Sequence, residues 1–169
     1  TDRIFEAYQE LRDDNIQYVI NLQGDEPMLD IEDVTNLLKK TIKKQSKIST
    51  LACQIEDEKF FLNTNVVKVI TKEELIQNNL STATSFTREI KNTQKNIYHH
   101  IGIYIYNISY LERFVQLEQT QNEKSQKLEQ LRLMDNNIKV DVGLAKTKPI
   151  GVDTDEDYLE IKKIMEYKN

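Results

Sequence analysis

The sequence has little of what marks secreted, membrane-spanning or nucleic-acid-binding proteins. It contains one cysteine, Cys53, so no disulfide can form within the chain and a cytoplasmic location is expected. No apolar run approaches the ~20 residues that a membrane-spanning helix needs. The 23 basic residues are outnumbered by 28 acidic ones, and the resulting net charge of −5 argues against nucleic acid as a partner. These absences favour a globular protein whose partner is neither a membrane nor a nucleic acid.

Glycine and proline are also scarce, with four glycines and two prolines. The glycines stand at positions 24, 102, 143 and 151, too far apart to form a loop that cradles phosphates. Neither Pro27 nor Pro149 marks a linker, and the sequence has no internal repeat. Residues 1–169 are therefore expected to form a single domain around one core.

The spacing of apolar residues predicts helices and strands that follow one another along the chain, as in α/β proteins. The clearest strand is 98–106, where alternation places His100 and Tyr104 on one face and His99 and Ile101 on the other. The two adjacent histidines therefore cannot bind one metal ion together. Helices are predicted at 1–12, from Asp30 (with Val34, Leu37, Leu38 and Ile42 buried), from a cap at Ser109, at 127–134 and from a cap at Thr154. Further strands are predicted at 18–22, 48–55, 63–70, 82–88 and 138–145, and a loop at 118–124.

The chain from Tyr18 to Pro27 combines a short apolar run with an acidic turn. Residues 18–22 predict a buried strand, and Gln23-Gly24-Asp25-Glu26-Pro27 predicts the tight turn that ends it. In open α/β sheets ligands bind beyond the carboxyl ends of strands, and Mg²⁺ takes carboxylate oxygens at such places. Spacing alone leaves open the alternative that Asp25 only caps the turn and that Glu26 is merely solvated.

Several motifs of this sequence occur together in one enzyme family. They are Gln23-Gly24-Asp25-Glu26-Pro27, Phe86-Thr87-Arg88, His100-x-Gly102-Ile103-Tyr104-x-Tyr106, Leu128-Glu129-Gln130-Leu131-Arg132 and Gly151-Val152-Asp153-Thr154. With them the chain resembles the 3-deoxy-D-manno-octulosonate (Kdo) cytidylyltransferases, also called CMP-Kdo synthetases. The resemblance implies an α/β fold, the Rossmann-like, glycosyltransferase-A-like three-layer nucleotidyltransferase fold.

The resemblance also implies an activity, a cofactor and a set of site residues. The family transfers CMP from CTP to Kdo and releases pyrophosphate, for lipopolysaccharide synthesis, and it is dimeric. By this match Asp25 and Asp153 are the catalytic residues and hold Mg²⁺. The implied sugar-binding residues are Gln23, Arg88, His100, Tyr104, Glu129 and Gln130, with His100 not acting as a general base. Without the resemblance, Arg88 reads as a loop arginine, His100 as a half-buried histidine, and Glu129 and Gln130 as ordinary helix formers.

The sequence departs from the family pattern in places. Lys91 replaces a proline after the Arg88 motif, Thr64 replaces another, and Gln121 and Gln126 replace a proline and a glutamate. The family's N-terminal segment, which holds the triphosphate, has no counterpart, so the resemblance covers the carboxyl-terminal two-thirds of the family. The fold is therefore expected to lack its N-terminal strand and phosphate loop.

From that departure we expect the isolated chain to lack significant CMP transfer, and strand 18–22 to expose an unpaired edge. A different sugar-acid cytidylyltransferase, such as one acting on sialic acid, is one alternative. A non-catalytic remnant that binds a sugar acid or a partner chain is another. Residues 108–117 are a candidate dimer interface.

Overall fold

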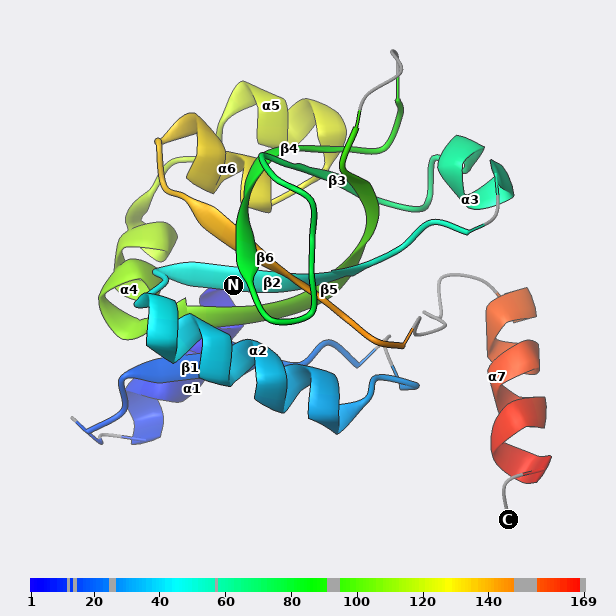
Figure 1. Ribbon diagram of the computed structural model, residues 1–169. Helices are drawn as coiled ribbons and strands as arrows, with labels where there is room; N and C mark the ends of the chain where they lie inside the picture. The colour runs from blue at the N-terminus through cyan, green and yellow to red at the C-terminus, as the bar shows by residue number, and fades with distance from the viewer. Residues whose placement is uncertain are drawn as a thin grey trace.

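A mixed sheet lies at the centre of the computed structural model, which describes residues 1–11, 13, 15–24, 27–56, 58–90, 95–147 and 155–167 (Figure 1). Its strands follow the order β1-β5-β2-β6-β4-β3, and β5 also pairs with β3. The strands are β1 (Tyr18–Asn21), β2 (Ile48–Cys53), β3 (Lys68–Thr71), β4 (Leu80–Thr87), β5 (Ile97–Asn107) and β6 (Val140–Leu144).

Four of these strands share one direction. β2 and β6 pair in parallel, and β5 runs antiparallel to β1, β2 and β3, so β1, β2, β3 and β6 all point the same way. Their carboxyl ends therefore meet at one edge of the sheet, where ligands collect in open α/β folds. The strand predicted at 18–22 is confirmed at Tyr18–Asn21. It lies at the end of the strand order and each of its residues is only half-buried, so the prediction that this strand is buried was wrong.

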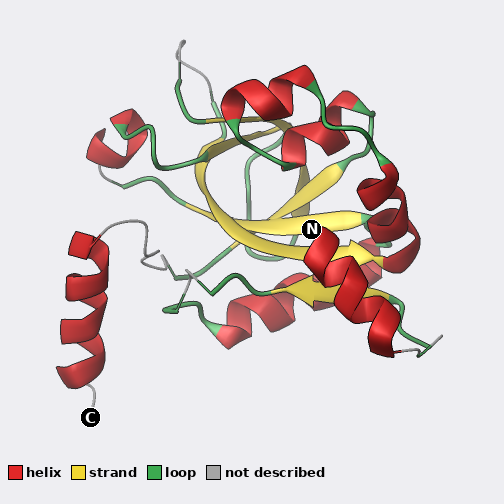
Figure 2. Cartoon of the chain, turned by 180° about the vertical axis from the view of Figure 1, so that it is seen from behind, coloured by secondary structure: helices red, strands yellow, loops and turns green. Residues whose placement is uncertain are grey.

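Helices cover both faces of this sheet (Figure 2). One face carries α2 (Ile31–Lys44), and the opposite face carries α1 (Asp2–Leu11), α4 (Ile108–Gln116), α5 (Gln121–Gln126) and α6 (Gln130–Asp135). The short helix α3 (Glu58–Leu62) and the helix α7 (Asp155–Tyr167) lie beside these layers. This arrangement confirms the α/β class. Within the described part of the chain, no helix combines the length and apolar character needed to cross a bilayer.

β5 divides the core into two clusters because its side chains alternate between the faces. Ile101, Ile103 and Ile105 are fully buried in the cluster that includes Leu37 of α2. Tyr104 and Tyr106 are buried in the other cluster, which includes Leu111 and Phe114 of α4. The alternation predicted for 98–106 is thus confirmed.

Several helix predictions need correction. Residues 118–124 were predicted as a loop, but Thr120 begins α5 with a complete capping box in which Glu123 bonds back to the Thr120 backbone. Lys127 then adopts a left-handed conformation (φ 53°) as the cap that ends α5, so the helix predicted at 127–134 begins only at Gln130. Both errors arose because polar capping, and not apolar periodicity, defines these short helices.

Other boundaries differ less. Asp30 caps α2 as predicted, through a side-chain bond to the backbone nitrogen of Glu32. Ile42, predicted to be buried, is 52% exposed. The cap of α4 is Asn107 and not Ser109, whose hydroxyl donates to the Asn107 side chain. The predicted cap at Thr154 lies outside the described residues.

Candidate functional site

The predicted metal ligands follow the two parallel strands β1 and β6. Asp25 comes after β1 and Asp153 after β6, and both lie outside the described residues. Within the described part of the chain, no group of three or more His, Cys, Asp or Glu side chains is placed to hold a metal ion. The metal site therefore stays a prediction. The structure shows only where β1 and β6, the strands that precede the two aspartates, come to an end.

A buried carboxylate joins the two chain segments that leave these strands. Asp33, in the first turn of α2, is 3% exposed. It accepts hydrogen bonds from the backbone nitrogens of Lys146 (2.9 Å) and Thr147 (3.1 Å) and from the Thr147 hydroxyl (2.9 Å). Since α2 begins shortly after Pro27, this contact fastens the chain beyond β6 to the helix that follows the acidic motif.

The face of β5 that looks toward α1 and α6 carries the predicted sugar-binding residues His100 and Tyr104. Gly102 lies between them on the same face, and a Cβ added there would lie 2.8 Å from Oε1 of Gln23. Gln23 therefore covers the space that the absent side chain leaves between the two rings. The structure thus brings Gln23, His100 and Tyr104 together, and the binding of a sugar by them stays a prediction.

His100 is neutral and held by its neighbours. Its Nε2 lies 2.9 Å from the hydroxyl of Thr50 in β2, a residue that the sequence analysis did not single out. Its ring packs edge-on against Phe86 at 5.1 Å between ring centroids. Burial, with a smaller electrostatic contribution from the neighbouring His99, lowers the pKa of His100 to about 3. A group with this pKa does not take up protons near neutrality, which agrees with the prediction that His100 is no general base.

Tyr104 has an unusual hydroxyl for a core residue. The side chain is 6% exposed, and the hydroxyl has no hydrogen-bond partner among the described residues. Burial, together with the nearby Tyr106 and Glu129, raises the pKa of the Tyr104 hydroxyl well above its usual value. A buried hydroxyl without a partner costs about 1–3 kcal/mol, so folding alone does not account for its presence. It stays protonated and can donate a hydrogen bond to a ligand.

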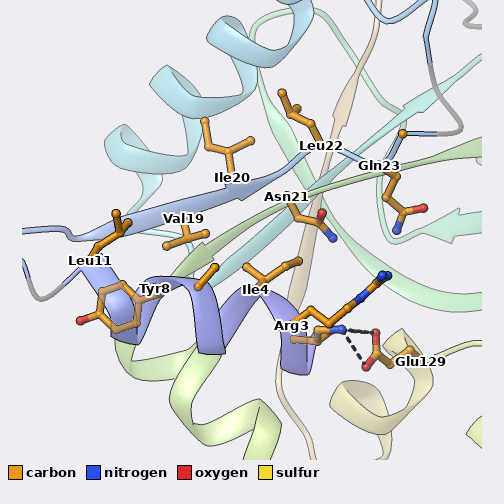
Figure 3. Close-up of a pocket in the computed structure, with 13 residues that line it drawn as sticks. Arg3, Ile4, Tyr8, Leu11, Val19, Ile20, Asn21, Leu22, Gln23 and Glu129 are labelled. Atoms are coloured by element: carbon orange, nitrogen blue, oxygen red, sulfur yellow. Dashed lines mark hydrogen bonds and ion pairs between the residues drawn. The ribbon is translucent and has the colours of Figure 1, made fainter.

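A groove of about 790 Å³ runs between α1 and the outer edge of β1 (Figure 3). Ile4 and Leu11 of α1 and Val19 of β1 line its apolar part, and Gln23 and Glu129 stand at its polar end. The predicted helix 1–12 is confirmed for residues 2–11, but Leu11 is 67% exposed because it faces this groove and not the core. The unpaired edge expected for strand 18–22 is thus one wall of a groove.

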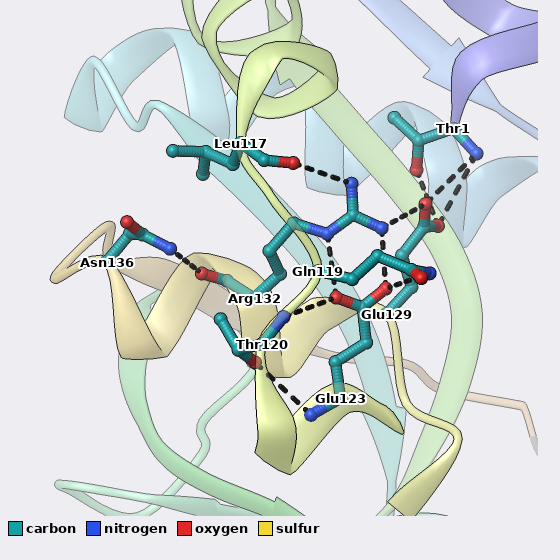
Figure 4. Close-up of polar contacts among 8 residues, drawn as sticks. All are labelled: Thr1, Leu117, Gln119, Thr120, Glu123, Glu129, Arg132 and Asn136. Carbon is teal, nitrogen blue, oxygen red and sulfur yellow. Dashed lines mark hydrogen bonds and ion pairs between the residues drawn. The ribbon is translucent and has the colours of Figure 1, made fainter. Parts of the chain in front are cut away.

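Glu129 is held at that end by groups from distant parts of the chain (Figure 4). Its carboxylate accepts a hydrogen bond of 2.6 Å from the Thr1 hydroxyl and lies 3.6 Å from Nη2 of Arg132. Glu129 immediately precedes α6. Its side chain is 42% exposed, so part of the carboxylate is open to solvent. Gln130, the first residue of α6, is buried at 8% exposure.

Arg132 is the buried side chain that supports this arrangement. Its Nε and Nη2 donate to the two carboxylate oxygens of Glu123, and the side chains of the pair are 7% and 6% exposed. The hydrogen bond from Arg132 holds the pKa of Glu123 below its usual value, and the same bond raises the pKa of Arg132. The guanidinium also lies over the Phe114 ring at 5.1 Å. The motif 128–132 predicted roles for Glu129 and Gln130. It did not indicate that the buried Arg132 forms an ion pair with Glu129.

Arg88 stands apart from these residues. Its Nε donates to the carbonyl of Gln126, and its Nη1 donates to the carbonyls of Thr64 and Asn65. Lys68, which is fully buried, donates from Nζ to the carbonyls of Asn63 and Arg88. Burial, and then the charge of Arg88, lowers the pKa of Lys68. The two cations thus organise the loops around Asn63–Asn65, and the contact of Arg88 with a carboxylate stays a prediction.

Comparison of the sequence with known proteins points to one family. The family described as cytidylyltransferase matches residues 1–140. A 3-deoxy-manno-octulosonate cytidylyltransferase of Thermodesulfovibrio yellowstonii is 42% identical over 167 residues, covering 93% of this chain and 66% of that protein. One from Rhodopseudomonas palustris is 38% identical, covering 98% of this chain and 67% of its own length. The chain thus spans about two-thirds of the length of the curated relatives it matches.

Solved structures agree with the sequence relatives. The structure of a CMP:2-keto-3-deoxy-manno-octonic acid synthetase complexed with CTP is similar to this chain, with a TM-score of 0.83 and 29% identity over 99% of the chain and 68% of that protein. A UDP-glucose pyrophosphorylase is also similar, with a TM-score of 0.66 over 98% of this chain and 59% of that protein. At 13% identity the second likeness shows the fold alone. The first, at 29% identity, supports an α/β fold like that of nucleotidyltransferases.

Proposed function

Because this chain belongs to the cytidylyltransferase family, we propose that it carries the sugar-acid side and the metal side of a Kdo cytidylyltransferase. In this reaction the hydroxyl oxygen on the anomeric carbon of Kdo attacks the α-phosphorus of CTP. The new oxygen–phosphorus bond gives CMP-Kdo, and the bond to the bridging oxygen breaks so that pyrophosphate leaves. The product would serve lipopolysaccharide synthesis in the cytoplasm. Such transfers depend mostly on positioning and on neutralising charge at phosphorus.

We assign Mg²⁺ to Asp25 and Asp153, whose carboxylate oxygens are the donors that this ion prefers. β1 and β6 are three strand steps apart in the sheet order, or about 14 Å at the usual spacing of strands. Asp153 follows the end of β6 at Leu144 by nine residues, which is enough chain to cross that distance. The hydrogen bonds of Lys146 and Thr147 to Asp33 support the proposal because they hold this segment against the first turn of α2, the helix that follows the acidic motif. The ion would lower the pKa of the attacking hydroxyl and neutralise charge on the phosphate.

The sugar acid is assigned to the polar face of β5. Gln23 and Tyr104 would bind its hydroxyl groups together with His100, and Glu129 would accept from another hydroxyl at the end of the groove. Gln130 completes the set predicted from the motif. The single observation that carries this assignment is the buried hydroxyl of Tyr104, because a buried polar group without a partner points to one supplied by a ligand.

Arg88 is proposed as the partner of the Kdo carboxylate. Its Nε and Nη1 already donate to backbone carbonyls, so a contact that uses both nitrogens requires these bonds to be exchanged. Binding of the sugar would then rearrange the loop at Thr64 and Asn65. This consequence can be tested by nuclear magnetic resonance, since the amide signals of that loop should shift when Kdo is added.

Calorimetric titration tests the proposal as a whole. We expect the chain to bind both Kdo and Mg²⁺, and we expect Asp25→Asn and Asp153→Asn to abolish the Mg²⁺ binding. Binding of Kdo without binding of Mg²⁺ favours the sugar-binding remnant. Binding of sialic acid in place of Kdo favours the related cytidylyltransferase, and binding of neither sugar contradicts the proposal. We also propose that the chain forms a homodimer, as the resemblance implies, and light scattering at the same concentrations tests this.

A further inference from the structure

Thr50 lies at an irregular position between β2 and β5. The pairing register shifts there, so that Thr50 is opposite Tyr104 whereas the next residue, Leu51, is opposite Ile101. Thr50 is fully buried. Its hydroxyl oxygen lies 2.7 Å from the carbonyl oxygen of Ile103 and 3.2 Å from that of Ile101. The same oxygen lies 2.9 Å from Nε2 of His100.

The number of hydrogens decides the direction of these contacts. A threonine hydroxyl has one hydrogen, and a carbonyl oxygen can only accept. The hydrogen therefore points to the nearer carbonyl, that of Ile103. If the hydroxyl instead donated to His100, its oxygen would face the carbonyl oxygen at 2.7 Å with no hydrogen between them. The contact with His100 is consequently made by an Nε2–H group that donates to Thr50.

The charge state of His100 completes the assignment. The ring is 8% exposed and lies between Phe86 and Tyr104, with centroid distances of 5.1 and 5.5 Å. A pKa of about 3 leaves one proton on the imidazole near neutrality, and that proton is on Nε2. Nδ1 then has a lone pair. No hydrogen bond to Nδ1 is found in the part of the chain that the structure describes.

We infer that Thr50 is a positioning residue that fixes His100 as the neutral Nε2–H tautomer, so that Nδ1 accepts a hydrogen bond from a hydroxyl group of the sugar acid. The ligand half of this inference rests on the proposed function. A carboxylate offers only lone pairs and cannot satisfy an acceptor, so the acid group of the ligand must be bound elsewhere. His100 therefore sets which side of the sugar faces β5, and Thr50 controls His100 without touching the ligand.

The tautomer can be measured without any ligand. His99 and His100 are the two histidines of the chain, so ¹⁵N-histidine labelling gives a spectrum of two rings, assigned with His99→Gln. We expect His100 to be protonated on Nε2 alone between pH 5 and 8. Thr50→Ser keeps the hydroxyl and should keep this pattern, whereas Thr50→Val keeps the shape and should shift the ring toward the Nδ1–H form. A wild-type ring protonated on Nδ1, or on both nitrogens near neutrality, overturns the inference.

Kdo itself tests the ligand half. Its addition should move the Nδ1 resonance of the wild-type protein as that nitrogen accepts a hydrogen bond. Thr50→Val should lower the affinity for Kdo by about 3- to 10-fold, the value of one hydrogen bond, and Thr50→Ser by less than about 2-fold. Equal affinities of the valine variant and the wild type overturn the assignment. Absence of Kdo binding to the wild type contradicts the proposed function and the hydroxyl contact together, while the nitrogen spectrum alone decides the tautomer.

Discussion

The two faces of β5 are built on different principles although they belong to one strand. Toward α2, Ile101, Ile103 and Ile105 are aliphatic and fully buried, and packing accounts for all of them. Toward α1 and α6, the strand presents His100 and Tyr104 beside the bare Gly102, together with polar groups that the core does not need. One face therefore stabilises the fold. The other carries polar side chains that are available to a ligand and that lower the stability of the fold.

Substitution on the aliphatic face should give the largest loss of stability. Ile103→Ala is expected to lower the free energy of unfolding by about 2–5 kcal/mol, because Ile103 is 0% exposed and its loss leaves a cavity. Urea unfolding at pH 7 measures this. Ile42→Ala, at a site that is 52% exposed, should change the free energy by less than about 0.5 kcal/mol. A large change in the Kdo affinity of folded Ile103→Ala would contradict the separation of the faces.

Acid should lower the stability of the protein through protonation of His100 on the polar face. The pKa of His100 is lowered from 6.5 to about 3 on folding, so the unfolded chain binds more protons between these values. The stability from neutral His100 is complete above pH 6.5 and is lost as the pH falls toward 3. At pH 4.5, about two pH units below the unfolded value, the loss is about 3 kcal/mol.

The matched variant for this test is His100→Gln, which takes up no proton. Its free energy of unfolding should fall less steeply with pH than that of the wild type between pH 6.5 and 4.5. Identical slopes for the two proteins would show that His100 is not held neutral in the folded state.

Tyr104 and Tyr98 allow a sharper comparison along the same strand. Tyr104→Phe removes a hydroxyl without a partner, so the free energy of unfolding should stay the same or rise by up to about 1 kcal/mol. Its Kdo affinity should fall by about 3- to 10-fold. The Tyr98 hydroxyl accepts a hydrogen bond of 2.9 Å from the backbone nitrogen of Leu75. Tyr98→Phe should therefore lose about 1 kcal/mol of stability and keep its affinity, and the reverse result for this pair would refute the assignment.

A small effect on stability is expected at Gly102. The added methyl group of Gly102→Ala would meet the flexible end of Gln23 at 2.8 Å, so that side chain moves and stability changes by less than about 1 kcal/mol. Kdo affinity should drop by about 2- to 3-fold through the displaced Gln23. Gly143→Ala provides the contrast, because its methyl would meet the packed side chains of Leu37 and Leu80 at 2.9 and 3.2 Å. It should destabilise by about 1–3 kcal/mol and leave Kdo affinity unchanged.

Much of the fold was predictable because apolar periodicity is local information. The alternation at 98–106 gave both faces of β5, and Asp30 gave the start of α2. The helix α5 was missed because its stability comes from a capping box and from the contact of Glu123 with Arg132, nine residues along the chain.

The site was predictable only as a set of residue types. The motifs named Gln23, His100 and Tyr104, which the structure places close together, and their role in binding a sugar stays a prediction. They could not indicate Thr50, because its role depends on a register shift between β2 and β5, which has no signature in either strand. They also gave no sign that Arg88 is engaged by three carbonyls, since those bonds join loops far apart in the sequence.

Lys68 offers a chemical reporter of the folded state. Its ammonium group is enclosed by carbonyl oxygens, whereas Lys39, Lys43 and Lys95 are exposed. An amine-reactive reagent should therefore acylate these surface lysines at once and reach Lys68 only in molecules that have opened. The rate at which Lys68 becomes labelled then reads out how often β3 and the adjoining loops separate, without any substitution in the chain.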